Sequence, residues 1–145
     1  MGIKMGITSS QAMKKAWTAF SKYIRIRDAV ATTDDIKEAK CVTCDNIKSI
    51  TGLNCMEAGH FIAGRHNSVL FNERNCHAQC QFCNRNLSGN YEKYKQFIIK
   101  AYGQETVDEL IALDKIIIKY NTSQLEEIAK EYNEMYEEIY KQYAN

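Results

Sequence analysis

The order of apolar and polar residues in the first part of the chain predicts a helix followed by a strand. In residues 9–20, SSQAMKKAWTAF, the apolar side chains recur at helical spacing, with Ser9 or Ser10 as the cap. The next segment, SKYIRIRDA over residues 21–29, alternates isoleucine with tyrosine and arginine. Because side chains alternate between the two faces of a strand, this segment predicts a strand with a basic face.

Short elements are predicted in the middle of the chain. Residues 41–45, CVTCD, predict a tight turn, and residues 55–62, CMEAGHFI, predict a short strand that ends near His60. The polar stretch that follows predicts a loop. A second strand is predicted over residues 75–80, and Asn84 then stands at the start of a helix.

Helical patterns dominate the rest of the chain. One helix is predicted to begin near residues 88–90 and to stop at Gly103, and another is predicted over residues 106–120. A last helix has apolar residues three or four positions apart from 125 to 143, which predicts a face that packs on another helix, within the chain or across a dimer. These elements predict an α+β fold with an N-terminal helix and strand, a central ββα unit and C-terminal helices.

Composition is that of a globular protein of about one domain. The 145 residues are 45% hydrophobic and 26% charged. No apolar run approaches the roughly 20 residues of a membrane span, and the N-terminus lacks a signal peptide's apolar core, so we expect a cytoplasmic protein. Residues 1–100 carry 15 Lys/Arg and 8 Asp/Glu, whereas residues 101–145 carry 4 and 10. This asymmetry indicates either a basic body that meets a polyanion or a salt-bridged acidic tail without bearing on partners.

Cysteine spacing predicts a metal site. Four of the six cysteines form two CxxC pairs, which in a reducing compartment favours metal thiolates over disulfides. The pairs are Cys41 with Cys44 and Cys80 with Cys83. Four thiolates complete the tetrahedral shell of Zn²⁺ and leave no position for substrate, so we expect a structural zinc. Cys55 and Cys76 stand alone and are predicted to be small buried side chains.

Side chains suited to acid–base chemistry surround the second CxxC pair. Asn75, His77 and Gln79 share one face of the second predicted strand, and Asn84 directly follows the pair. One zinc ion that ties two strands and a helix together would bring His60, Asn75, His77 and Asn84 to one cleft.

This arrangement resembles the HNH, or ββα-metal, nuclease motif. Zinc-bearing members place an Asn five residues before a CxxC pair and a His or Asn directly after it, as Asn75 and Asn84 stand here. The resemblance implies that His60 is a general base that activates water and that Asn75 orients it through a hydrogen bond. It also implies that Asn84 helps to hold a catalytic divalent metal, Mg²⁺ or Mn²⁺. A neutral imidazole can take a proton near neutral pH, and the metal stabilises charge on the leaving oxygen.

One position departs from that motif. Many such nucleases have an Asp metal ligand immediately before the catalytic His, where this chain has Gly59. Glu57 or His77 would have to take the place of that ligand. His77 is predicted to be either a metal or transition-state contact or a helper in the polar network.

A second resemblance covers roughly residues 16–110. The motifs that carry it are FSKYIRIRDA, CVTC, AGHFIAGRH, FNERNCHAQCQFCNRNLSGN and YxxYxxFIIKAYG. They are similar to those of the phage NinG recombination family, also called Rap. The family positions fall on His60, Arg65, Asn75, His77, Gln79, Asn84 and residues 88–90.

This resemblance implies a structure-specific endonuclease in the cytoplasm of a bacterial host. Its substrates would be branched DNA such as Holliday junctions, and phage recombination proteins are candidate partners. It implies a zinc-bound HNH-like core over residues 1–103 and an acidic helical region over residues 104–145. A homodimer formed through the last helix would place two cleavage sites on two opposed DNA strands.

Basic residues could contact DNA, with solvated arginines as the alternative. Those expected to do so are Arg65, Arg74 and Arg85 around the predicted cleft and Lys22, Arg25 and Arg27 on the predicted basic strand. Two hypotheses follow: a metal-dependent endonuclease, or a zinc-stabilised DNA-binding module without catalysis, in which His60 only contacts phosphate.

Overall fold

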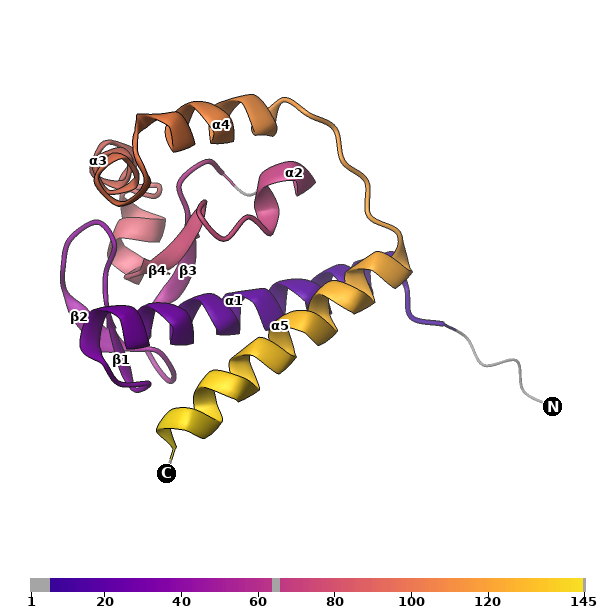
Figure 1. Cartoon of the computed structure of the whole chain (residues 1–145), viewed down its shortest axis with the longest axis horizontal. Coiled ribbons are helices and arrows are strands. Elements are labelled where there is room, and N and C mark those ends of the chain that lie inside the picture. The colour runs from indigo at the N-terminus through magenta and orange to yellow at the C-terminus, as the bar shows by residue number, and fades with distance from the viewer. Residues whose placement is uncertain (1–5, 64–65, 145) are drawn as a thin grey trace.

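The fold is built around a small β-hairpin that lies between two layers of helices. The computed structural model describes residues 6–63 and 66–144. The elements are α1 (Ser9–Thr33), β1 (Glu38–Lys40), β2 (Ile47–Ser49), β3 (Glu57–His60), α2 (Asn67–Leu70), β4 (Cys76–Gln79), η1 (Phe82–Asn86), α3 (Tyr91–Tyr102), α4 (Gln104–Asp114) and α5 (Thr122–Tyr143). The long helices α1 and α5 run side by side below the β3–β4 hairpin, and α3 and α4 lie above it (Figure 1). The mixed α+β architecture agrees with the predicted class.

The strand predicted over residues 21–29 is wrong, because this segment is the C-terminal part of α1. Ile24 packs in the cluster that holds Tyr132 of α5, whereas Ile26 packs in the cluster that holds Met56. Both isoleucines are buried because different elements cover different sides of α1. A helix enclosed in this way imitates the alternation of a strand.

The two predicted strands around His60 are confirmed as one antiparallel hairpin. In its register Gly59 lies opposite His77, and His60 lies opposite Cys76. Neighbouring residues of a strand face opposite sides, so this register places His60 and His77 on different faces of the hairpin. The second hairpin, β1–β2, was not predicted, because each of its strands is only three residues long.

A partly buried ion pair attaches α1 to β4. The Asp28 carboxylate accepts the backbone N–H of Ala78 at 2.7 Å and the Arg27 Nε at 2.8 Å. Arg27 also donates to the carbonyl oxygens of Glu73 and Cys76, at 2.8 and 2.7 Å. These bonds satisfy backbone groups along β4 and fix the hairpin on the helix.

The C-terminal helices end only in part where the sequence predicts. Helix α3 ends before Gly103 as predicted, but α4 ends at Asp114 instead of continuing to residue 120. Residues 116–118 then cross from the α4 layer to α5 (Figure 1). Ile117 is 87% exposed, so this apolar run has no face to bury that would keep it helical.

The apolar stripe of α5 packs on α1. Leu125, Ala129 and Tyr132 are buried there, in clusters that include Ala16 and Phe20 of α1. This result confirms the intramolecular alternative for the stripe. The same face is therefore not available as a dimer interface.

Candidate metal centre and active site

The four paired cysteines come together as predicted. Their Sγ atoms all lie within 4.8 Å of one another, and those of Cys44 and Cys80 are 3.7 Å apart. Four Zn–S bonds of about 2.3 Å in a tetrahedron separate the sulfurs by roughly 3.8 Å. The set fits a structural Zn²⁺, and the backbone N–H groups of Cys80 and Cys83 donate to neighbouring sulfurs in it.

Electrostatics of the cluster also favour a cation. Burial alone would raise the pKa of Cys41, but hydrogen bonds to its sulfur, the Cys80 N–H first, lower that pKa to about 7. Burial and the nearby Cys41 sulfur raise the pKa of Cys44 to about 12. Thiolates packed this closely repel one another, and a shared metal ion removes that repulsion.

The residues 88–90 form the turn that joins this cluster to α3. Ser88, Gly89 and Asn90 have φ values of 50°, 91° and 51°, so three consecutive residues adopt the left-handed conformation. The Gly89 N–H donates to the carbonyl of Cys83 at 2.9 Å, and Asn90 Nδ2 lies 3.8 Å from the Cys83 sulfur. The SGN motif therefore fixes the second cysteine pair against α3.

His60 lies at the end of β3 on the side that faces α1. Its ring stacks on Trp17, with centroids 5.1 Å apart and an interplanar angle of 27°. Its Nε2 is 2.9 Å from the carbonyl oxygen of Leu70. A carbonyl can only accept, so Nε2 carries the proton and Nδ1 keeps its lone pair. Burial lowers the pKa of His60, although the bond to Leu70 opposes this, so the imidazole is neutral at neutral pH.

Asn75 holds the loop that orients His60. Its amide is fully buried, accepts from the Ile62 N–H at 2.7 Å, and donates to the carbonyls of Ile62 and Val69 at 2.8 and 3.1 Å. Val69 is followed by Leu70, whose carbonyl bonds His60. The contacts of Asn75 therefore run through the loop backbone, whereas we had expected a direct bond to the imidazole.

Gln79 explains why residue 59 is a glycine. A Cβ at Gly59 would lie 2.1 Å from Gln79 Oε1. The Gln79 amide is held in place because it donates to Thr43 Oγ1 at 3.1 Å and to the Gly89 carbonyl at 2.8 Å. An Asp at position 59 therefore has no room, and the metal ligand of the HNH motif is sterically excluded at this position.

His77 does not join His60 in one cleft. It lies on the opposite face of the hairpin, where Tyr94 Oη is 3.1 Å from Nδ1 and Tyr102 Oη is 2.8 Å from Nε2. Tyr94 donates its hydroxyl proton to the Gly59 carbonyl, so its oxygen accepts the proton of His77 Nδ1. His77 Nε2 then has no proton and accepts from the Tyr102 hydroxyl. Burial lowers the pKa of His77 to about 4. Both ring nitrogens are thus satisfied within an aromatic box.

A cleft of about 410 Å³ is lined by Trp17, the residue whose ring stacks on His60, but His60 itself is not among its lining residues. Its lining residues are Trp17, Ser21, Arg25, Cys55, Met56, Glu57, Ala58, Asn84 and Arg85. Asn84 Nδ2 is 3.1 Å from Glu57 Oε1, and Arg85 donates to both carboxylate oxygens. Glu57 and Asn84 are thus the predicted metal ligands that the fold brings together. An amide turned by 180° would present a second oxygen beside the carboxylate, a donor pair suited to Mg²⁺ or Mn²⁺.

The basic residues predicted to contact DNA divide into two groups. Arg27 is committed to Asp28 and β4, and Arg25 donates to the carbonyls of Ser21 and Ile50. Lys22 lies 4.3 Å from the centre of the Tyr136 ring. Since these three are on a helix, they do not form the basic strand face that we expected.

The loop arginines are more accessible. The side chains of Arg74 and Arg85 are 59% and 65% exposed and pair with Glu109 and Glu57. Arg65 lies outside the described residues. Trp17 and Asp28, which position His60 and the hairpin, were missed because they stand on α1, far from the CxxC pairs in sequence.

The isolated cysteines are not part of the metal cluster. Cys76 is fully buried in the apolar cluster between α1 and α5, and burial raises the pKa of its thiol, as expected for a small packed side chain. Cys55 is half-buried and lines the cleft.

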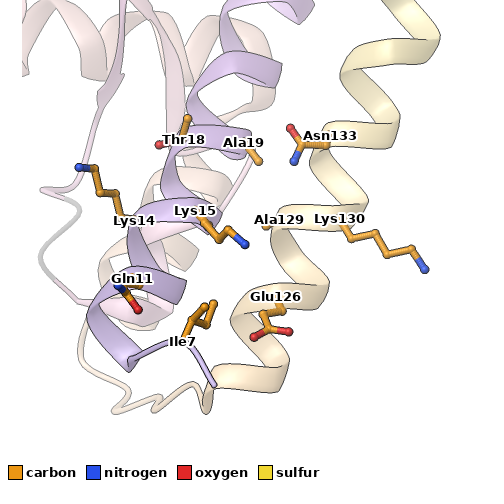
Figure 2. Close-up of a pocket in the computed structure, with 10 residues that line it drawn as sticks. All are labelled: Ile7, Gln11, Lys14, Lys15, Thr18, Ala19, Glu126, Ala129, Lys130 and Asn133. Atoms are coloured by element: carbon orange, nitrogen blue, oxygen red, sulfur yellow. The ribbon is translucent and has the colours of Figure 1, made fainter. Parts of the chain in front are cut away.

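A larger groove of about 760 Å³ runs between α1 and α5 (Figure 2). Lys15 points into it beside Ala129, whereas Lys14 and Lys130 point away from it. None of the predicted catalytic residues lines this groove. We assign no site to it.

Together, the fold and the cysteine cluster define a class, a small mixed α+β protein with a four-cysteine site that could bind a metal such as zinc. The family model described as "Bacteriophage Lambda NinG protein" matches residues 7–142. The chain belongs to the NinG family, which confirms the family part of the sequence prediction.

The curated relatives are phage proteins. The chain is 34% identical over 99 residues to Protein ninG of Escherichia phage lambda, a match that covers 68% of this chain and 43% of that protein. It is 29% identical over 128 residues to Protein ninG of Salmonella phage P22, covering 88% and 57%. The chain thus spans about half the length of these relatives. No solved structure matches it significantly. No helix in the described part of the chain is long and apolar enough to cross a membrane.

Proposed function

We propose that this protein is a metal-dependent DNA endonuclease that cuts branched DNA, such as Holliday junctions, during phage recombination in the host cytoplasm. The observation that carries the proposal is the state of His60. One ring nitrogen is fixed by a backbone carbonyl, the imidazole is neutral, and among the described residues none forms a hydrogen bond with Nδ1. This is the state that a general base requires before it takes a proton.

The proposed reaction is phosphodiester hydrolysis. His60 Nδ1 accepts a proton from water while the water oxygen forms a bond to phosphorus. The bond from phosphorus to one ester oxygen breaks, and that oxygen takes a proton from solvent. Glu57 and Asn84 would hold Mg²⁺ or Mn²⁺, which stabilises charge on the leaving oxygen when bound. Asn75 acts as a positioning residue through the loop that carries Leu70.

Cleavage of labelled Holliday-junction and Y-shaped DNA with Mg²⁺ or Mn²⁺ tests the proposal. We expect His60→Ala to bind the junction like the wild type but to cut about 10²- to 10⁴-fold more slowly, the usual contribution of a general base. His66→Ala is the matched control, because His66 is 63% exposed and pairs with Asp114 at 2.9 Å. Equal cutting by the wild type and His60→Ala would refute the role of His60.

A zinc-stabilised DNA-binding module without catalysis is the second candidate. Two observations favour it: Gly59 excludes the usual Asp ligand, and Arg85 covers the Glu57 carboxylate. Under this alternative the wild type binds junctions but cuts none of them with any divalent metal.

Cutting two opposed strands of a junction would need two copies of the protein. Since the stripe of α5 packs on α1, we propose that a homodimer, if formed, uses another surface. Light scattering of the protein free and on a junction tests this, and a monomer in both states would remove the dimer.

A further inference from the structure

Both oxygens of the Glu57 carboxylate accept hydrogen bonds in the conformation described. Arg85 Nε and Asn84 Nδ2 each lie 3.1 Å from Oε1, and an Arg85 terminal nitrogen donates to Oε2. The Glu57 side chain is 22% exposed, whereas that of Arg85 is 65% exposed. A cation that approached this carboxylate would meet a guanidinium of the same sign.

Arg85 has an alternative partner whenever DNA is present. Its side chain is 65% exposed, and its bonds are all to Glu57 among the described contacts. A planar guanidinium binds two oxygens of a phosphate with the same two-pronged geometry that it uses on a carboxylate. A phosphate at the mouth of the cleft would therefore compete with Glu57 for Arg85.

We propose that Arg85 covers Glu57 in the free protein and moves to a substrate phosphate on binding, which frees Glu57 to bind a divalent cation. This inference rests on the proposed nuclease function. It makes DNA and metal binding mutually dependent: DNA strengthens metal binding at Glu57, and by reciprocity the metal strengthens DNA binding. The free protein would hold the catalytic metal weakly.

Mn²⁺ binding measured by electron paramagnetic resonance tests the proposal without relying on cleavage. The zinc-loaded His60→Ala protein is titrated with Mn²⁺, alone and with saturating junction DNA, after subtraction of Mn²⁺ bound by DNA alone. We expect DNA to tighten Mn²⁺ binding by roughly tenfold, within the usual range of coupling between sites.

Substitutions of Arg85 in the same His60→Ala protein test whether Arg85 is the residue that blocks metal binding at Glu57. Arg85→Gln should bind Mn²⁺ more tightly than its parent without DNA and gain little when DNA is added. Arg85→Lys, which keeps the charge but loses the two-pronged bond, should be intermediate. Lys130→Gln is the control and should behave like its parent, because Lys130 is exposed on α5 and does not line the cleft that holds Glu57.

The outcomes separate this inference from the nuclease proposal. If Glu57→Gln weakens Mn²⁺ binding but Arg85→Gln changes neither the Mn²⁺ affinity nor the effect of DNA on it, the proposed blocking of Glu57 by Arg85 is refuted. The metal site at Glu57 is then supported. If Glu57→Gln has no effect on Mn²⁺ with or without DNA, the metal site itself is refuted.

Discussion

Two histidines on one hairpin, His60 and His77, have opposite surroundings. Burial lowers the pKa of both, so both are neutral at neutral pH. His77 is bonded at both nitrogens by tyrosine hydroxyls, whereas His60 is bonded at Nε2 by a carbonyl. Burial and a lowered pKa are therefore common to both residues and do not distinguish them. His60 alone of the two meets the requirement of the proposed general base, an oriented ring whose second nitrogen accepts no hydrogen bond from the described residues.

Zinc removal should destabilise the surroundings of both histidines, and we expect it to lower the stability of the protein more than any substitution below. Cys80 and Cys83 follow β4 directly, so the metal fixes the hairpin that carries both residues. Loss of a structural zinc costs about 10 kcal/mol or more, which exceeds or consumes the stability of a typical domain. We expect a zinc chelator to abolish the cooperative melting transition in circular dichroism.

Cys55→Ser is the control for that experiment, since Cys55 is outside the cluster and half-buried. It should melt like the wild type and lose its fold with the chelator in the same way. An unchanged melting temperature after verified loss of zinc would contradict the structural role of the metal.

His77→Ala should act on stability rather than on chemistry. It leaves a cavity among Tyr94, Phe97 and Tyr102 and removes the acceptor of the Tyr102 hydroxyl. We expect a loss of about 2–4 kcal/mol in the free energy of unfolding, measured by urea denaturation of the zinc-loaded protein. Loss of cleavage by a fully folded His77→Ala protein would assign His77 a role in the reaction.

Low pH should lower the stability of the protein through His77. Burial holds the pKa of folded His77 at about 4, whereas an unfolded histidine titrates near about 6.5. As the pH falls through this window, the unfolded chain binds a proton that folded His77 does not. The free energy of unfolding therefore falls by up to about 3 kcal/mol. Urea denaturation of the wild type and His77→Ala at pH 7 and pH 4.5 isolates the contribution of His77 to this loss of stability, and we expect the variant to lack that contribution.

Trp17→Ala should have the smallest effect and should act only on the His60 side. Without the stacked ring, His60 loses burial, so its pKa rises and the acid limb of the cleavage rate moves to higher pH. We expect a rate loss of roughly tenfold or less at neutral pH, and Trp17→Phe should recover most of it. A pH profile that does not move would make Trp17 a packing residue only.

Local spacing was enough to predict the four-cysteine cluster, the hairpin strands and the end of α3. A CxxC pair or a glycine stop is decided by neighbouring residues. The separation of His60 from His77 could not be predicted, because it depends on the register that places Gly59 opposite His77. The helix over residues 21–29 was missed because two separate clusters bury Ile24 and Ile26. The crowding of Gly59 by Gln79 likewise comes from a contact across the hairpin.

Single-turnover cleavage of one labelled Holliday junction by the wild type, His60→Ala and His77→Ala decides whether the two histidines differ in function. All three proteins are compared at saturating concentration, with Mn²⁺ present and with equal zinc content. We predict that the wild type and His77→Ala cut the junction at similar rates, while His60→Ala binds it but cuts about 10²- to 10⁴-fold more slowly. Cutting by His60→Ala at the wild-type rate, or no cutting by the wild type, would contradict the assignment of His60 as the general base of a nuclease.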